Sequence, residues 1–506
     1  MSGIYGLSGS GMDVDALVKN LMKAQRVKYD TLQQKKTQLE WKKADYNTIY
    51  TSINSFRTNS VFNTKLQGTL MPKAVNSSDE TKATITANAD AANVNHTLEI
   101  TDLASGVNKT SSGPISASQG AVKDALTTHV GIDSTEGKFT ITLKNGTASA
   151  AIEVDPTKSI NEMVSSINKA NIDIKASYDA ILDRIFLHTA NTGANTSIEV
   201  TDFALTKGTL AGKSFVKDIL KVDATVANKG TDANIVLDGT ALSQTTNSFT
   251  ISGVTYNLKK TTAVGEKITV GVTPDIDKTI GNVKAFVEAY NTNLAKINTE
   301  IDETKYKDFL PLTDDQKSSM KDADITAWEA KAKSGLLHND SILQRLASTM
   351  RSDLSTPVKG LTGPYTTSSS IGITTGAWQD GGKLYLDETK LKKALQADPE
   401  VVNKIFGTSN DGNTHDQNGI AVRLYDTLKT ISDKIATEAG ASVSTTIDTK
   451  SNIAKQIANY TKTMTALNTR LEDMQEAYYK KFNAMETALN KLNQQSSWLS
   501  QQLGTK

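Results

Sequence analysis

The two ends of this chain carry long stretches in which apolar residues recur with helical spacing. From Gly11 to Gly68 there is no other glycine and no proline, so one helix can run through most of this stretch. Its apolar residues fall on heptad positions: Val18, Leu21, Leu32, Leu39, Tyr46, Ile49, Ile53 and Phe56. Lysine and glutamine hold the intervening core positions in the first half. The pattern therefore predicts a helix that needs a partner to bury its stripe.

A second such stretch, residues 441–503, has a better filled heptad. Its apolar residues are Ile453, Ile457, Tyr460, Met464, Leu467, Leu471, Met474 and Tyr478, followed after a change of register by Phe482, Met485, Leu489, Leu492 and Leu499. Neither helix can bury its stripe alone, so we expect the chain ends to pack together, with 39–56 alongside 453–474. The densest part of the stripe, from Leu471 to Leu492, predicts an adhesive face that another surface must cover.

The middle of the chain, about 80–275, shows the two-residue alternation of β-strands, most clearly in 139–154. Within that run, Asn145–Gly146 predicts a hairpin turn of type I′. Helical spacing returns after 275. Capping boxes, in which Glu or Gln follows three residues after Ser or Thr, predict helix starts at Ser159, Thr313 and Ser341.

Together these patterns predict an α+β multidomain protein. We expect long terminal helices that form a coiled-coil or helical leg, with nested β-rich domains inserted between them. The expected parts are leg segments 1–40 and 455–506, a helical core domain 41–78 and 276–454, an outer β-rich domain 79–107 and 216–275, and an inserted inner β-rich domain 108–215.

Composition narrows the possible functions. Lys and Arg number 56 against 55 Asp and Glu, so no basic surplus indicates a nucleic-acid partner. No apolar run is long enough to span a membrane, and we expect no Sec signal, because the N-terminal residues show neither its basic region nor its apolar region. There is no cysteine, and the five histidines lack metal-ligand spacing. We therefore expect no catalytic, metal or cofactor site.

Three motifs resemble ligand sites but lack a required part. The opening "GLSGSGMDVDALVKNLM" misses the third glycine of a dinucleotide loop, and Asp13 is better explained as a helix N-cap. The segment "GTLAGKS" at 208–214 is one residue shorter than a P-loop. The oxygen-rich stretch 409–419 lacks the ligand set of an EF-hand. We interpret the last two as surface loops.

Four stretches resemble the flagellar hook-associated protein 2 family, the caps of bacterial flagellar filaments. They are "GLSGSGMDVDALVKNLMKAQ", "FLPLTDDQKSSMKDADITAWEAKAKSGLLHNDSILQRL", "IGITTGAWQDGGKLYLDETKLKKALQADPEVVNKIF" and "MQEAYYKKFNAMETALNKLNQQSSWL". They span both ends of the chain. The β-rich centre resembles the family in architecture alone.

The resemblance implies a secreted, extracellular, non-enzymatic protein at the flagellum tip. It implies a homo-oligomeric cap that promotes polymerisation of exported flagellin and is required for filament elongation and motility. The implied partners are flagellin, hook–filament junction proteins, and a cytoplasmic export chaperone that holds the C-terminal helix before type III export. No cofactor is implied.

Two other readings stay open at this point. One is a secreted surface adhesin or glycan-binding protein with a helical stalk, and adhesion could also be a secondary role. Such a binding face should show clustered exposed aromatic residues, whereas those between 80 and 275 are spread singly. The other is a related flagellin or hook–filament junction protein.

Overall fold

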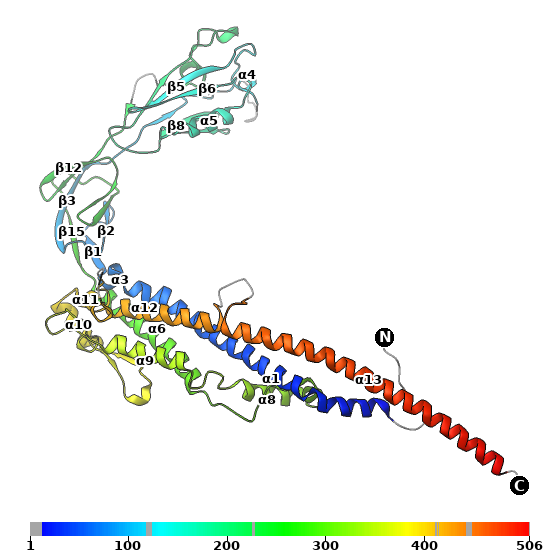
Figure 1. Ribbon diagram of the computed structural model, residues 1–506. Coiled ribbons are helices and arrows are strands. Elements are labelled where there is room, and N and C mark those ends of the chain that lie inside the picture. The colour runs from blue at the N-terminus through cyan, green and yellow to red at the C-terminus, as the bar shows by residue number, and fades with distance from the viewer. Residues whose placement is uncertain are drawn as a thin grey trace. The chain divides into compact units, whose positions relative to one another are not determined.

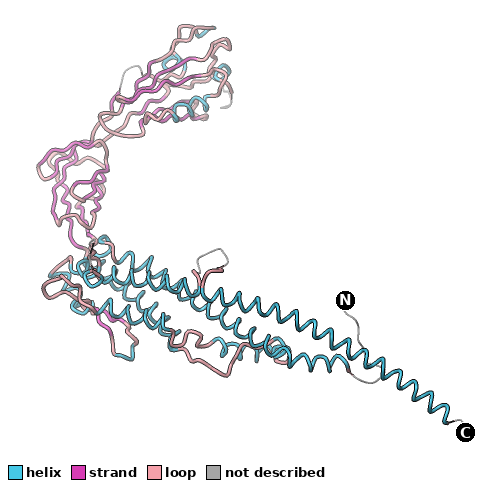
Figure 2. Tube along the Cα trace, viewed as in Figure 1, coloured by secondary structure: helices cyan, strands magenta, loops and turns pink. Residues whose placement is uncertain are grey.

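The computed structural model describes residues 13–117, 124–224, 228–409, 412, 414–441 and 448–504. It divides into a helical unit, Met1–Met71 with Ile276–Lys506, and a β unit, Pro72–Asp275 (Figures 1 and 2). The β unit is thus inserted between the helices of both chain ends. The predicted fold class is confirmed.

The first helix of the helical unit, α1 (Val14–Ser55), begins where the sequence predicts. Asp13 is its N-cap, and the Asp13 carboxylate accepts a hydrogen bond from the Ala16 N–H at 2.9 Å. The helix continues through a π-helical turn, η1 (Phe56–Val61), whose wider spacing lets both end residues be buried. The path then continues through α2 (Phe62–Thr64) and α3 (Gln67–Leu70).

The rest of the helical unit follows the β unit in the chain. Its helices are α6 (Ile276–Asp302), α7 (Asp314–Ser318), α8 (Asp322–Lys333), α9 (Ser341–Ser355), α10 (Glu388–Ala397), α11 (Val401–Phe406), α12 (Ile420–Ala439) and α13 (Asn452–Leu503). Two short strands, β16 (Ile373–Thr375) and β17 (Leu384–Leu386), pair in antiparallel fashion. An aromatic cluster lies in the core, where the rings of Phe286 and Phe406 meet edge to face at 5.4 Å.

The predicted helix starts are correct in two of three cases. Capping boxes open α7 at Thr313 and the short helix α5 (Ile160–Lys169) at Ser159. The predicted box at Ser341 is wrong, because the preceding Asp340 is the N-cap and its carboxylate accepts the Ile342 N–H at 3.0 Å. An ionised carboxylate is the stronger acceptor at the positive end of a helix.

The last helix begins later than the sequence alone indicates. The absence of glycine and proline after Gly440 allows a start at 441, whereas α13 begins at Asn452 with Ser451 as its N-cap. Asp448 precedes this cap and accepts hydrogen bonds from the Lys450 and Ser451 N–H groups. A capped turn therefore sets the helix start more strongly than helix propensity does.

Within residues 72–117, 124–224 and 228–275, the β unit contains four sheets and two separate hydrophobic cores. The first core, from residues 83–104 and 233–272, lies with a five-stranded sheet in the order β1-β15-β3-β11-β12 and a three-stranded sheet in the order β13-β14-β2. These strands are β1 (Lys73–Ser77), β2 (Ala83–Ala87), β3 (Val94–Asp102), β11 (Ala233–Leu237), β12 (Thr240–Gln244), β13 (Ser248–Ile251), β14 (Val254–Leu258) and β15 (Ile268–Pro274).

The second core, from residues 107–224, lies with a sheet in the order β10-β9-β5-β6, a sheet in the order β4-β8-β7, and α5. These strands are β4 (Asn108–Thr110), β5 (Phe139–Asn145), β6 (Ala148–Val154), β7 (Ile174–Asp179), β8 (Arg184–Thr189), β9 (Ser197–Thr201) and β10 (Asn228–Lys229). A short helix, α4 (Leu126–His129), belongs to the same region. The finer division into outer and inner domains stays a prediction.

The hairpin predicted at Asn145–Gly146 is present, but its turn differs. Asn145 still pairs with Ala148, so the two loop residues are Gly146 and Thr147. Of these two, only Gly146 has a positive φ, at 56°. A positive φ at the first loop residue alone is the type II′ pattern, so the type I′ prediction is wrong.

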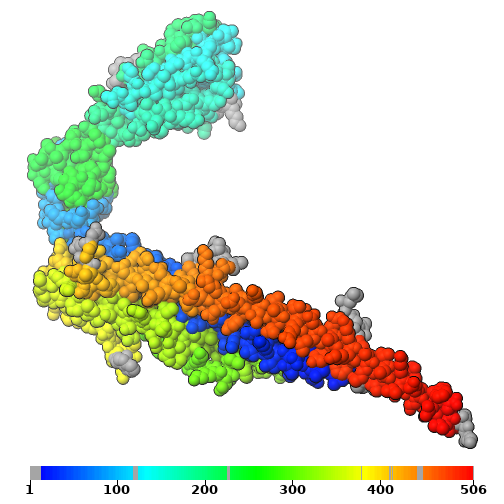
Figure 3. Space-filling view, in the orientation of Figure 1, coloured from blue at the N-terminus to red at the C-terminus, as the bar shows by residue number. Residues whose placement is uncertain are grey.

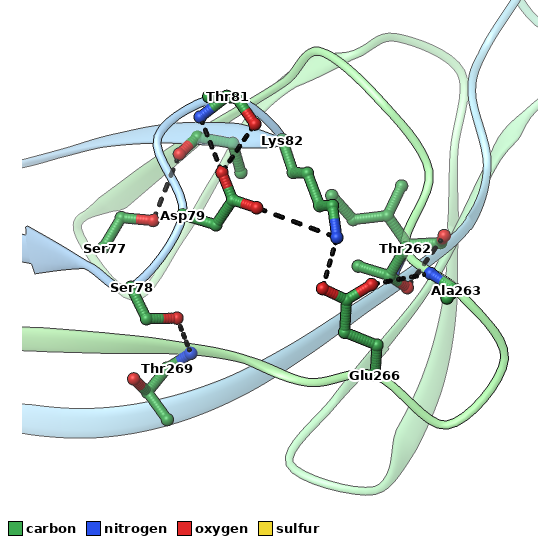
Figure 4. Close-up of polar contacts among 11 residues, drawn as sticks. Ser77, Ser78, Asp79, Thr81, Lys82, Thr262, Ala263, Glu266 and Thr269 are labelled. Atoms are coloured by element: carbon green, nitrogen blue, oxygen red, sulfur yellow. Dashed lines mark hydrogen bonds and ion pairs between the residues drawn. The ribbon is translucent and has the colours of Figure 1, made fainter.

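Ion pairs connect the loops at one end of the five-stranded sheet (Figure 4). The Lys82 ammonium contacts the carboxylates of both Asp79 and Glu266. Glu266 also accepts the Ala263 N–H at 2.9 Å, and Asp79 accepts the Thr81 N–H at 2.9 Å. These contacts fix loop geometry and leave the charges mutually paired, as expected of structural rather than ligand-binding groups.

Candidate assembly site

The first and last helices pack against each other in antiparallel fashion (Figures 1 and 3). Near the start of α1, the Tyr479 hydroxyl donates to the Asp15 carboxylate at 2.9 Å. Near the start of α13, the Lys43 ammonium lies 2.7 Å from the Asp448 carboxylate. The prediction that the two chain ends pack together is confirmed.

Near the start of α13, which we name the base of the helix pair, both helices pack into the large hydrophobic core of the helical unit, the main core. The heptad residues of α1 and the first residue of η1 are all buried in it: Tyr46, Ile49, Ile53 and Phe56. From α13, Ile453 is buried in this core, and Ile457 packs against it together with Leu39 of α1. The Tyr46 hydroxyl donates to the Asp340 carboxylate at 2.6 Å, which ties α1 to the start of α9.

The middle of the helix pair is only half-buried. Four residues predicted to pack lie there: Leu32, Tyr460, Met464 and Leu467. None of the described residues of α1 from Lys23 to Asp45 is fully buried, and none of α13 from Lys455 to Arg470 is. The weak seam expected from the lysines and glutamine in the heptad is therefore observed.

A separate small core, which we name the tip cluster, lies at the other end of the pair. Its buried members are Val14, Val18, Met22 and Leu471, and its partly buried members are Tyr29, Met474, Tyr478, Tyr479 and Phe482. The predicted pairing of 39–56 with 453–474 places Leu471 and Met474 alongside the second half of α1. The antiparallel pairing instead places them against the start of α1.

Four residues of the predicted stripes are exposed. Leu21 is 41% exposed, Met485 is 40%, Leu492 is 59% and Leu499 is 52% exposed, while Leu489 is half-buried. Met22 takes the buried position beside Leu21. The prediction that Leu21 packs within the chain is therefore wrong, and any role of these four residues in assembly stays a prediction.

The sequence does hold a signal for the residues that were missed. Val14, Val18 and Met22 are spaced by four residues, which is the spacing of one helix face. A heptad that includes Val18 does not select this face, because a heptad alternates steps of three and four. Tyr479 follows the heptad position Tyr478 and therefore lies outside the same pattern.

Two carboxyl groups near the base of the pair have strongly raised pKa values. Burial raises the pKa of Asp45 on α1 to about 6, with a further contribution from the negative charge of Glu303. Burial likewise raises the pKa of Glu300 on α6 to about 7, with repulsion from Asp45 and Glu303. Lys333 offsets part of the effect at Asp45. These groups make the α1–α6 contact sensitive to pH near neutrality.

Elsewhere, the structure lends no support to the motifs that resemble ligand sites. Among them, no group of three or more His, Cys, Asp or Glu side chains could hold a metal ion. The Asp133 carboxylate lies against Gly208, where it would repel a phosphate. The glycines of the opening loop, up to Gly11, and part of 409–419 lie outside the described residues. Within the described part of the chain, no helix combines the length and apolarity needed to cross a bilayer.

The aromatic residues of the β unit offer no binding face of the kind an adhesin would need. The seven that the sequence scatters there are all buried or half-buried: Phe139, Tyr178, Phe186, Phe203, Phe215, Phe249 and Tyr256. Stacking of Phe139 on Phe203, with ring centres 4.5 Å apart, is typical of this packing. The site of interest is therefore the paired helices of the chain ends.

Two family models match the chain. The model of the flagellar hook-associated protein 2 C-terminus matches residues 230–494, and that of the N-terminus matches residues 10–106. The chain belongs to the flagellar hook-associated protein 2 family. Both models reach into the paired helices, which makes this pair part of what the family shares.

Individual relatives are similar in sequence over almost the whole chain. Flagellar hook-associated protein 2 of Halalkalibacterium halodurans is 28% identical, covering 97% of this chain and 98% of its own length. The A-type protein of Pseudomonas aeruginosa is 27% identical, covering 98% of this chain and 96% of its own. The fold matches the crystal structure of the D1-D2-D3 domains of the flagellar cap protein FliD from Escherichia coli at 20% identity, with a TM-score of 0.54, over 82% of this chain and 99% of that one.

Proposed function

We propose that this chain is a structural cap at the distal tip of the bacterial flagellar filament. As a homo-oligomer it promotes polymerisation of exported flagellin, and filament elongation and motility require it. The observation that carries the proposal is the antiparallel pair of α1 and α13 in a member of this family. Such a pair presents long helices with unused apolar positions, which suit packing against other helices.

The apolar residues that the chain leaves exposed support the oligomeric role. On α13 they are Met485, Leu492, Trp498, Leu499 and Leu503, and on α1 they are Leu17, Leu21 and Val27. Exposed apolar stripes on helices mark contacts with other protein surfaces. We propose that they contact neighbouring cap subunits, flagellin and hook–filament junction proteins after assembly, and a cytoplasmic export chaperone before it.

The proposal also covers location and chemistry. The protein acts outside the cell at the flagellum tip, after export through the type III apparatus. It needs no cofactor and performs no catalysis. Nucleic acid is not a proposed partner, because positive and negative side chains are almost equal in number.

The test is complementation of a strain that lacks the gene. The intact chain should restore filaments and motility, whereas the strain without it should release unpolymerised flagellin into the medium. Leu492→Asp should reduce filament length and the yield of multi-subunit particles seen by electron microscopy without changing the melting temperature. Gln494→Asp adds the same charge at an exposed polar position and should behave as the intact chain. Full filaments without the gene would refute the cap function.

A further inference from the structure

The outer edge of strand β6 is free among the described residues. β6 is the last strand of the sheet β10-β9-β5-β6, and it pairs there with β5 alone (Figure 1). Asn145 pairs with Ala148 across a two-residue loop, so this pair exchanges two hydrogen bonds, and so does every second pair after it. The N–H and C=O groups of Ser149, Ala151 and Glu153 therefore point away from β5. None of the described residues hydrogen-bonds to these backbone groups.

β6 lacks the features that keep an edge strand from pairing with another chain. It is seven residues long and contains no proline and no lysine. In the two sheets around the second core, as far as they are described, each of the other edge strands carries a lysine: Lys229 in β10, Lys109 in β4 and Lys175 in β7. An edge lysine discourages pairing with a further strand. The side chains of Ser149 and Ala151 are exposed and small, so they do not cover the edge of β6.

We infer that β6 pairs with β6 of a second copy of this chain, antiparallel and centred on Ala151. A free strand edge binds another extended strand, and the register indicates which strand fits. When Ala151 lies opposite its own counterpart, all seven residues of both strands overlap. Ser149 then lies opposite Glu153 of the partner subunit. Each of the three outward-facing pairs exchanges two hydrogen bonds across the contact.

The side chains favour this register over its neighbours. Glu153 lies opposite a serine, and its carboxylate already has the Lys138 ammonium of its own chain at 2.8 Å. A register centred on Glu153 would place like charges directly opposite each other, which is destabilising. On the other face of the strand, Ile152 comes opposite Ala150 of the partner subunit. Ile152 belongs to the second core and Ala150 packs against it, so the contact continues an apolar face from one copy to the next.

The contact at β6 joins identical chains two by two. It is isologous, because the same strand serves on both sides. The inference adds this contact to the homo-oligomer proposed above, and it rests on that proposal only for the association of identical chains. The paired helices of the chain ends take no part in it.

The test uses the full chain with one introduced cysteine, which gives a specific crosslink because the chain has no other cysteine. In Ala151→Cys the two thiols meet at the centre of the contact, where the Cα atoms are about 5.5 Å apart and a short bismaleimide can bridge them. Ala148→Cys is the matched control, because it makes the same change at an exposed alanine of the same strand, with its counterpart roughly 20 Å away. Ala151→Cys should give at least about tenfold more crosslinked dimer than Ala148→Cys.

A second pair of variants tests the hydrogen bonds of the contact. At high chain concentration the amides of 148–154 should be protected from hydrogen exchange, and dilution should remove this protection. Ala151→Lys places like charges opposite each other at the centre and should weaken the pairing at least about fivefold. Ala148→Lys adds the same charge at the end of the strand and should keep the protection. At low concentration both variants should melt at the temperature of the unaltered chain, because the changed side chains are exposed.

Equal crosslinking of Ala151→Cys and Ala148→Cys would overturn the contact. Exchange over 148–154 that does not depend on chain concentration would overturn it as well. Multi-subunit particles that form without the crosslink of Ala151→Cys would overturn the contact and leave the proposed cap function in place. A chain that stays monomeric at every concentration would overturn the contact and also contradict the proposed homo-oligomer.

Discussion

The raised pKa values of Asp45 and Glu300 predict that the helical unit loses stability as the pH rises. The perturbation is Glu300→Gln, which keeps the shape of the side chain and removes its charge. No hydrogen bond is described for the Glu300 carboxylate, whereas Glu303 accepts the Gly335 N–H at 2.7 Å and is left unchanged. The substitution therefore removes mainly the unfavourable burial of a charge at this position and the repulsion from its acidic neighbours.

The sign follows from proton linkage. In the folded chain these two groups hold their protons to about pH 6 and pH 7, from ordinary values of 3.8 and 4.5. Between about pH 4 and pH 7 the folded state therefore binds more protons than the unfolded state, and stability falls as the pH rises. Each pKa unit corresponds to about 1.4 kcal/mol. Because both groups are partly exposed and their mutual repulsion counts once, we expect a total loss of about 2–3 kcal/mol.

The assay is urea unfolding followed by tryptophan fluorescence at several pH values from 4.5 to 8. All four tryptophans belong to the helical unit, so the β unit does not contribute. Glu300→Gln should raise the free energy of unfolding by about 1–2 kcal/mol at pH 8 and by much less at pH 4.5. Glu288→Gln, at an exposed position of the same helix, should change neither value. A flat pH profile of the unaltered chain, or a less stable Glu300→Gln at pH 8, would refute the reasoning.

Three further substitutions test other contacts of the helical unit. Asp448→Asn should cost about 1–3 kcal/mol at pH 7 through loss of the Lys43 ion pair, measured by the same unfolding assay. Hydrogen bonding lowers the pKa of Asp448, so the ion pair stabilises the folded state above pH 3.8, and this stabilisation is lost as the pH falls. An equally large cost of Asp448→Asn at low pH would contradict this reasoning. Gly335→Ala should lower the melting temperature, because φ is +71° and the new Cβ would lie 2.7 Å from Lys305 Cα; an unchanged value would argue against that strain. Phe286→Ala should lower the free energy of unfolding in urea by about 3–5 kcal/mol, because it leaves a cavity in the core. A loss of less than about 1 kcal/mol would mean that the core rearranges to fill this cavity.

Much of the fold could be predicted because hydrophobic period decides element type. The heptads of both chain ends, the alternation of 139–154 and the N-cap at Asp13 each correspond to an observed element. Details that depend on competing acceptors were harder to predict. Asp340 caps α9 in place of Ser341, and the turn at Gly146 adopts type II′ because Asn145 remains in the strand.

The candidate assembly site likewise has one part that could be predicted from the sequence and one part that could not. The base of the helix pair was predictable, because Tyr46, Ile49 and Ile53 are large apolar residues on consecutive heptad positions. The tip was not, because a heptad assumes a supercoil maintained over several turns. A contact of only a few turns can use steps of four, which bury Met22 and leave Leu21 in solvent.

The half-buried middle of α1 also determines how the tip opens. Lysines and glutamine there leave little apolar area to bury against α13, so this stretch adds little to the pairing of the two helices. Side chains four residues apart nevertheless support the helix itself: Arg26 with Asp30, and Lys36 with Glu40 at 2.7 Å. Each such pair stabilises a helix by about 0.3–0.5 kcal/mol without any partner helix. Loss of the tip cluster should therefore separate α1 from α13 rather than unfold it, leaving two amphipathic helices free to bind other chains.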